Sequence, residues 1–183
     1  SFEEFEEALN SPGPWIAGID FPFGQSRKFI ENSGWPNTWA GYVSHVASLD
    51  RETFRQKLTD YKAPRQSGDK EHRSKTDINT GAISPQKLYG VPVALMFYEG
   101  APRIQKSGAT IPGLKTGDPQ RIIVESYPGI LARTLIGKRS YKQDTKRKQT
   151  ADQFEARAEI LHKITSGALT KSHGLTVTAP MNL

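Results

Sequence analysis

The stretch "WIAGIDFPFG", residues 15–24, decides how this chain is organised. An apolar run from Trp15 to Ile19 leads directly into a carboxylate, Asp20, and the segment 21–24 then breaks the run with a proline and a glycine. A short apolar run bounded by turn residues predicts a buried β-strand, and proline and glycine predict its end. We therefore expect a strand that delivers one acid to a tight turn.

A second stretch, "RIIVESYPG" at residues 121–129, has the same order of features. An apolar run carries Glu125, and Pro128 follows as a stop. In α/β sheets, ligand sites lie outside the carboxyl ends of the strands, so Asp20 and Glu125 are expected to converge. Convergent carboxylates without thiolates suit Mg²⁺ or Mn²⁺, which could hold a phosphodiester. The spacing supports a second interpretation equally well, in which each acid caps a helix or pairs with an arginine.

Segments with helical spacing of apolar residues alternate with these strands. This alternation predicts an α/β fold with at least partly parallel strands. Helices are predicted over residues 1–10, 26–32 and 130–136, from Pro36 through Val46, after Asp50 through Tyr61, and between the Thr150 cap and Gly167. Another is predicted from Pro92 towards Ile104, with a kink or an early stop at residues 100–102.

Four local features of these segments can be compared with the structure. Pro36 is expected as a first helical residue. The aromatic and apolar stripe of the helix after Asp50 is expected in the core rather than as a base-stacking platform. The last helix should begin with a capping box and bury a stripe that includes Phe154. The polar tract 62–90 shows no periodicity, so it is expected to be functional or disordered.

Composition narrows the function classes. The chain has 183 residues, 25 Lys and Arg against 19 Asp and Glu, and a net charge of +6, which is compatible with an acidic partner such as nucleic acid. There is no cysteine, which fits a reducing cytoplasm and excludes disulfides, thiolate metal sites and cysteine nucleophiles. The longest apolar run is too short to cross a membrane.

Other chemistry has little support in the sequence. Neither a P-loop, a dinucleotide-binding glycine motif nor a nucleophile elbow is present, and the four histidines are scattered. A basic stretch follows residue 137 and could bind phosphates, although a solvated loop is the simpler interpretation. Its cations are Lys138, Arg139, Lys142, Lys146, Arg147 and Lys148.

Several motifs together resemble a bacterial family described as predicted RNase H-like nucleases. They are "GPWIAGIDFPFG", "KLYGVPVALMFYEGAPR", "VESYPGILARTLIGKRSYK" and the Arg73-x-x-x-Asp77 pair, and they span roughly residues 11–145. The resemblance implies one ribonuclease-H-like domain over residues 1–183, with a mixed central sheet flanked by helices. It also implies acids around one or two Mg²⁺ or Mn²⁺ ions.

The resemblance also implies roles for the individual residues that match the motifs of the family. Asp20 and Glu125 would be metal ligands and catalytic residues, and Lys142 would be a catalytic lysine. Arg73 and Asp77 would line the same cleft, and the interpretation adds Lys87 and Arg139 as substrate-binding cations. The family has an earlier strand with an acid and a later acid-bearing helix, both expected to be missing here, so the site could be incomplete and inactive.

Three functions therefore stay open. The first is a divalent-metal-dependent nuclease or phosphodiester hydrolase. The second is a non-catalytic module on the same scaffold that binds nucleic acid or another partner. The third is a small-molecule phosphotransferase of the actin-like ATPase type, against which the missing phosphate loops count.

Overall fold

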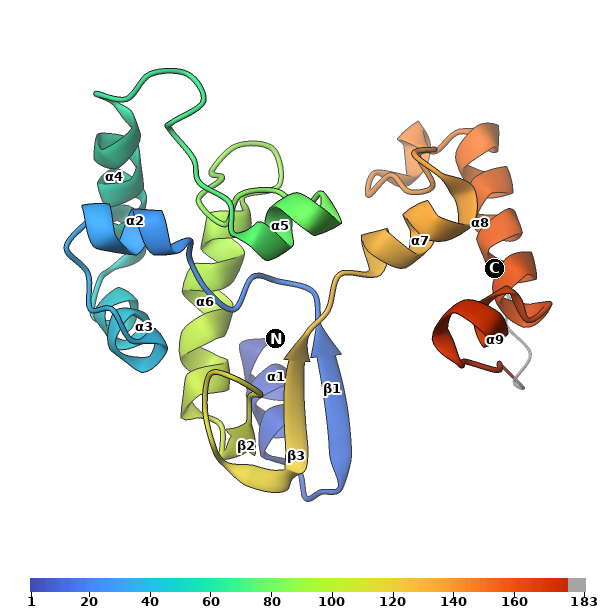
Figure 1. The fold of residues 1–183 in the computed structure, drawn as a ribbon, viewed down its shortest axis with the longest axis horizontal. Helices are drawn as coiled ribbons and strands as arrows, with labels where there is room; N and C mark the ends of the chain where they lie inside the picture. Colours follow the sequence, from blue (N-terminus) through green and yellow to red (C-terminus); the bar gives the residue numbers. More distant parts are fainter. Residues whose placement is uncertain (178–183) are drawn as a thin grey trace. The chain divides into compact units, whose positions relative to one another are not determined.

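The structure, a computed structural model, describes residues 1–177 (Figure 1). Its contacts fall into two compact units, Ser1–Ser126 and Tyr127–Leu183, and we describe each by itself. Within residues 1–177, no helix has the length and apolarity needed to cross a membrane.

The first unit is a mixed α/β assembly, as the alternation of strands and helices predicts. Its strands are β1, β2 and β3, and its described helices run from α1 to α6. In chain order they are α1 (Phe2–Asn10), β1 (Trp15–Ile19), α2 (Arg27–Asn32), α3 (Trp39–Ala47), α4 (Arg51–Lys62), α5 (Lys75–Thr80), α6 (Val93–Lys106), β2 (Ala109–Thr110) and β3 (Asp118–Glu125).

The three strands form one parallel sheet in the order β1-β3-β2. Both predicted strands are present, and they lie side by side and point the same way (Figure 1). The expected burial of the first one is wrong, because β1 is an edge strand without a buried residue, and Ile16 is 72% exposed. Their register pairs Trp15 with Arg121 at one end and Ile19 with Glu125 at the other. The expected mixed sheet is not what these strands form, because every pairing between them is parallel.

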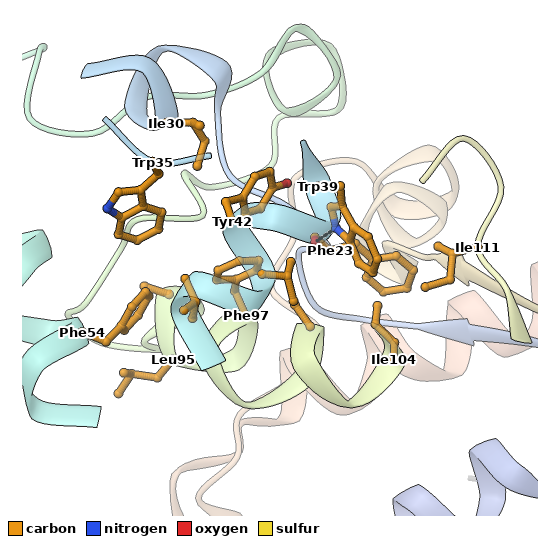
Figure 2. Packing of buried hydrophobic residues seen from close by; sticks show 14 of the residues in the cluster. Phe23, Ile30, Trp35, Trp39, Tyr42, Phe54, Leu95, Phe97, Ile104 and Ile111 are labelled. Atoms are coloured by element: carbon orange, nitrogen blue, oxygen red, sulfur yellow. Dashed lines mark hydrogen bonds between the residues drawn. The ribbon is translucent and has the colours of Figure 1, made fainter. Parts of the chain in front are cut away.

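An aromatic core lies among α2, α3, α4 and α6 (Figure 2). Phe54, Leu58 and Phe97 are completely buried, and the Phe54 and Phe97 ring centroids are 6.4 Å apart. The prediction that the α4 stripe belongs to the core is therefore confirmed. Tyr61 lies at the margin of this core, with its ring edge-on to Phe29 at 4.8 Å.

The start of α3 differs from the expected one. The helix begins at Trp39, not at Pro36, because the Thr38 side chain accepts a hydrogen bond from the Gly41 backbone N–H at 3.1 Å. A threonine that satisfies a free backbone donor is a better helix start than a proline that only presets one dihedral angle. The expected apolar face of α3 is nevertheless buried.

The polar tract 62–90 has more structure than its sequence predicts. It contains α5 and a buried hydrogen-bond network around Gln86, whose side chain is fully buried. The Gln86 amide accepts the His72 backbone N–H at 2.7 Å and donates to Ser26 Oγ at 3.2 Å, while Ser84 Oγ donates to the His72 carbonyl at 2.8 Å. Burial lowers the pKa of His72, since the interior disfavours its charged form. The network fixes the tract on the helical core.

The second unit consists of helices and a basic loop. Its elements are α7 (Pro128–Ile136), a 3₁₀ turn (Lys146–Lys148), α8 (Ala151–Thr165) and α9 (Ala168–His173). The capping box of Thr150 and Gln153 is confirmed. The predicted α8 stripe is wrong at Phe154, which is 53% exposed. The helix instead buries Ala156, and the small core of this unit also includes Ile160 and Ile164.

We predict that Gly100→Ala destabilises the protein by about 1–3 kcal/mol, the usual cost of overpacking. A Cβ atom at Gly100, inside α6, would lie 2.4 Å from the Phe21 ring. Urea unfolding measures the change in the free energy of unfolding. Phe21→Leu in the same chain makes room for the methyl group, so the double variant should lose less than the sum of the two single variants. Strict additivity would contradict this close contact.

Candidate active site at the carboxyl ends of β1 and β3

The parallel register places the ends of β1 and β3 next to each other. Ile19 is the partner of Glu125, and the Ser126 N–H donates to the Ile19 carbonyl at 3.0 Å. Asp20 follows Ile19 directly, so it leaves the sheet at the same edge as Glu125. Two acids that are far apart in the sequence therefore reach one rim of the sheet.

The Glu125 side chain closes the turn that follows Asp20. Its Oε2 atom accepts the Phe23 backbone N–H at 3.0 Å. Asp20 itself is exposed, and within residues 1–177 its side chain has neither a hydrogen bond nor an ion pair. The alternative interpretation, in which each acid caps a helix or pairs with an arginine, therefore has no support among the described contacts.

The electrostatic environment of Glu125 is unfavourable for its charge. Desolvation by the surrounding chain raises the pKa of Glu125, and the negative charges of Asp77 and Asp20 raise it further, while the Phe23 N–H opposes them. The residue as a whole stays exposed, so water is withdrawn from the carboxyl group only in part. A cation placed here would relieve the repulsion among these acids.

Asp77 belongs to this environment through α5. Its Oδ2 atom accepts the Ser74 backbone N–H at 2.7 Å and the Ser74 hydroxyl at 2.8 Å, which completes a capping box at the start of the helix. Arg73, four residues before it, is exposed and forms no ion pair with Asp77 in the described part of the chain. Asp77 is thus oriented by its own helix rather than by Arg73.

The carboxylate oxygens at this rim suit a hard divalent cation that takes only some of its ligands from the protein. Within residues 1–177, no three His, Cys, Asp or Glu side chains are grouped as metal ligands. Asp20 and Glu125 nevertheless provide two oxygen donors on adjacent strand ends. Mg²⁺ in enzymes typically uses one or two carboxylates and completes its shell with water and phosphate oxygens.

Sequence reasoning missed Tyr42 as part of this environment. Burial raises the pKa of Tyr42, and the charge of Glu125 raises it further, so the phenol stays protonated as a potential donor. A pocket of about 290 Å³ is lined by Tyr42 and by Gln25, whose Oε1 atom is buried without a hydrogen-bond partner among residues 1–177. Only the helical spacing of Tyr42 is visible in the sequence, and that spacing predicts a core residue.

The expected cationic residues lie in several places. Lys87 is half-buried, with its Nζ atom 5.0 Å from the centre of the Tyr89 ring. Lys142 and Arg139 belong to the second unit, where Lys142 is exposed and Arg139 pairs with Glu159. The expected role of Lys142 at the acidic rim therefore stays a prediction.

Comparisons with known proteins found no relative of this chain. No protein-family model matches the chain, and neither a curated protein nor a solved structure does.

We predict that Glu125→Gln raises the melting temperature at neutral pH by about 1–2 °C, a shift that in a chain of this size corresponds to a fraction of a kcal/mol. Glutamine can still accept the Phe23 N–H but carries no charge. Because folding raises the pKa of Glu125 above its ordinary value of 4.5, the wild type should lose stability as the pH rises from that value through the folded pKa.

Thermal melts between acidic and neutral pH measure this difference. The pH-dependent loss should be smaller in the Glu125→Gln variant than in the wild type. Glu7→Gln is the control, because Glu7 is exposed on α1 and makes no ion pair in the described residues. Identical pH profiles for the wild type and Glu125→Gln would contradict the inferred charge repulsion.

Proposed function

We propose that this chain is a divalent-metal-dependent phosphodiester hydrolase, with the nuclease type as its closest chemical class. The observation that supports this proposal is the parallel register of Ile19 with Glu125, which brings Asp20 and Glu125 to one rim near the charge of Asp77. An acid with a perturbed pKa at the carboxyl edge of a parallel sheet, as Glu125 is, is typical of a functional site. The motif resemblance to RNase H-like nucleases favours the same chemistry.

Asp20 and Glu125 would bind Mg²⁺ or Mn²⁺ in this proposal. A divalent ion supplies charge neutralisation on the phosphate oxygens and a more acidic bound water. In the hydrolysis, water attacks phosphorus, the bond to the leaving oxygen breaks, and the proton released by the water balances the proton gained by that oxygen. The Phe23 N–H fixes one oxygen of Glu125, which leaves the other for the ion.

The remaining residues would act on the substrate. Arg73 is exposed, has no ion pair within residues 1–177 and lies one residue before the α5 cap, so it is a candidate to bind a phosphate oxygen. Lys142 is proposed for the same task on the basis of its motif. Tyr42 and Gln25 line a pocket of the first unit, where they would donate to and accept from a sugar or base.

We expect Asp20→Asn to abolish Mn²⁺-dependent cleavage of oligonucleotides and to remove stabilisation of the fold by Mn²⁺. The wild type should melt at a higher temperature in millimolar Mn²⁺ than in EDTA, because an ion that binds only the folded state stabilises it. Asp60→Asn is a matched control, since Asp60 is an exposed acid on α4 whose side chain bonds only to Gln56 in the described residues.

Two results would refute the hydrolase proposal. One is cleavage by Asp20→Asn at the wild-type rate, and the other is the lack of any Mn²⁺-dependent cleavage by the wild type. A thermal shift with ATP and Mg²⁺, in the absence of cleavage, would favour a phosphotransferase instead.

A further inference from the structure

All of the net charge of the chain is carried by the second unit. Ser1–Ser126 contains 15 Lys and Arg and 15 Asp and Glu, whereas Tyr127–Leu183 contains 10 against 4. The second unit thus has a charge of +6, equal to that of the whole chain. A charge this concentrated favours a polyanionic partner far more than an average over the chain suggests.

Most of these cations lie in one exposed loop, residues 138–148, which we call the basic segment. It holds six Lys and Arg residues and a single acid, Asp144. In the described chain only Arg139 among them forms an ion pair, with Glu159. The other five are exposed and have no ion-pair partner among residues 1–177; they are Lys138, Lys142, Lys146, Arg147 and Lys148.

The backbone of the basic segment is held by polar side chains of α8. Arg157 donates to the Tyr141 carbonyl at 2.9 Å, and Gln153 donates to Ser140 Oγ at 2.9 Å and to the Lys142 carbonyl at 3.3 Å. These bonds fix the loop through its carbonyl and hydroxyl groups and leave the charged groups of the lysines free. A fixed backbone lowers the conformational entropy that binding must offset.

An exposed aromatic ring accompanies the cations. Phe154 on α8 is 53% exposed, and the guanidinium carbon of Arg157 lies 5.9 Å from the centre of its ring. Since Arg157 also bonds to Tyr141, the ring belongs to the same surface as the basic segment. Free cations next to an exposed aromatic ring are the combination that binds phosphates and stacks bases.

We propose that the basic segment and Phe154 form a binding surface for single-stranded nucleic acid. A membrane surface fits less well, because binding there requires an apolar face and the only large apolar residue of the segment, Tyr141, packs against the core of the unit. The inference gives single-stranded nucleic acid as the substrate class of the proposed hydrolase. Hydrolysis of the bound strand rests on that proposal. Binding itself requires neither Asp20 nor a metal ion.

The test measures binding of a labelled single-stranded oligonucleotide by fluorescence anisotropy in EDTA, so that hydrolysis does not contribute. If the five free cations each contact a phosphate, the logarithm of the affinity should fall against the logarithm of salt concentration with a slope of about −3.5. Charge reversal at the 3₁₀ turn, Lys146→Glu, Arg147→Glu and Lys148→Glu together, should weaken binding at least about tenfold and flatten this slope.

A matched variant separates a local surface from a general charge effect. Lys57→Glu, Lys70→Glu and Lys106→Glu change the net charge equally but lie on exposed positions of the first unit. Because these lysines are not part of the proposed surface, this variant should bind like the wild type at physiological salt, where only charges close to a phosphate act on it. Equal losses in both triple variants, or binding without salt dependence, would overturn the proposal.

Phe154→Ala distinguishes nucleic acid from other polyanions. It should weaken oligonucleotide binding about fivefold or more, the cost of one lost base-stacking contact, and leave binding to heparin unchanged. Equal effects on both ligands would overturn the assignment to nucleic acid. If the basic-segment variant cleaves the oligonucleotide as fast as the wild type, the proposed binding surface is refuted but the hydrolase proposal is not. If the wild type binds the oligonucleotide but shows no Mn²⁺-dependent cleavage, the hydrolase proposal is refuted but the binding surface is not.

Discussion

The bond from the Phe23 N–H to Glu125 connects the sheet to the turn that carries Asp20. It depends on the register of β1 and β3, because a slip by one residue would turn Glu125 to the opposite face of the sheet. It depends equally on the core, since the Phe23 carbonyl accepts the Trp39 indole N–H at 2.7 Å (Figure 2). The position of the acids is therefore set by contacts on both sides of the turn, and it persists only while the strand pairing and the aromatic core are both intact.

Two glutamates show how differently this fold treats a carboxylate. Glu159 lies between Lys163 and Arg139, and these cations lower its pKa to about 2. Desolvation raises the pKa of Glu125 instead, and the charges of Asp77 and Asp20 raise it further. Glu159 gains two cationic partners when the chain folds, whereas Glu125 gains only the neutral Phe23 N–H and loses water around its charge. Such a cost is typical of groups kept for binding or catalysis rather than for stability.

The sequence predicted those features that depend on neighbours within one segment. Both strands with their terminal acids and the Thr150 capping box follow from local spacing, and all are present. The predictions failed where distant residues decide. Phe154 has the spacing of a buried stripe, but the face of α8 that is buried is the one that meets α7 and α9. The tract 62–90 reads as unstructured because its order depends on Gln86 reaching Ser26, 60 residues earlier, which no periodicity reveals.

The residues of the candidate site also divide into those that local spacing predicts and those that only distant contacts place. Two of its acids could be predicted because each ends a strand, and only the parallel pairing was needed to unite them. Tyr42 could not be predicted as a neighbour of the site, because its spacing is that of any core residue. The cations of the first unit are balanced by an equal number of its own acids, and some form ion pairs, as Lys62 does with Glu71 at 2.6 Å and Arg103 with Glu6 at 3.0 Å. Because the first unit has no net charge, recognition of a phosphate backbone would fall to the second unit, whose basic segment holds five cations without an ion-pair partner among residues 1–177.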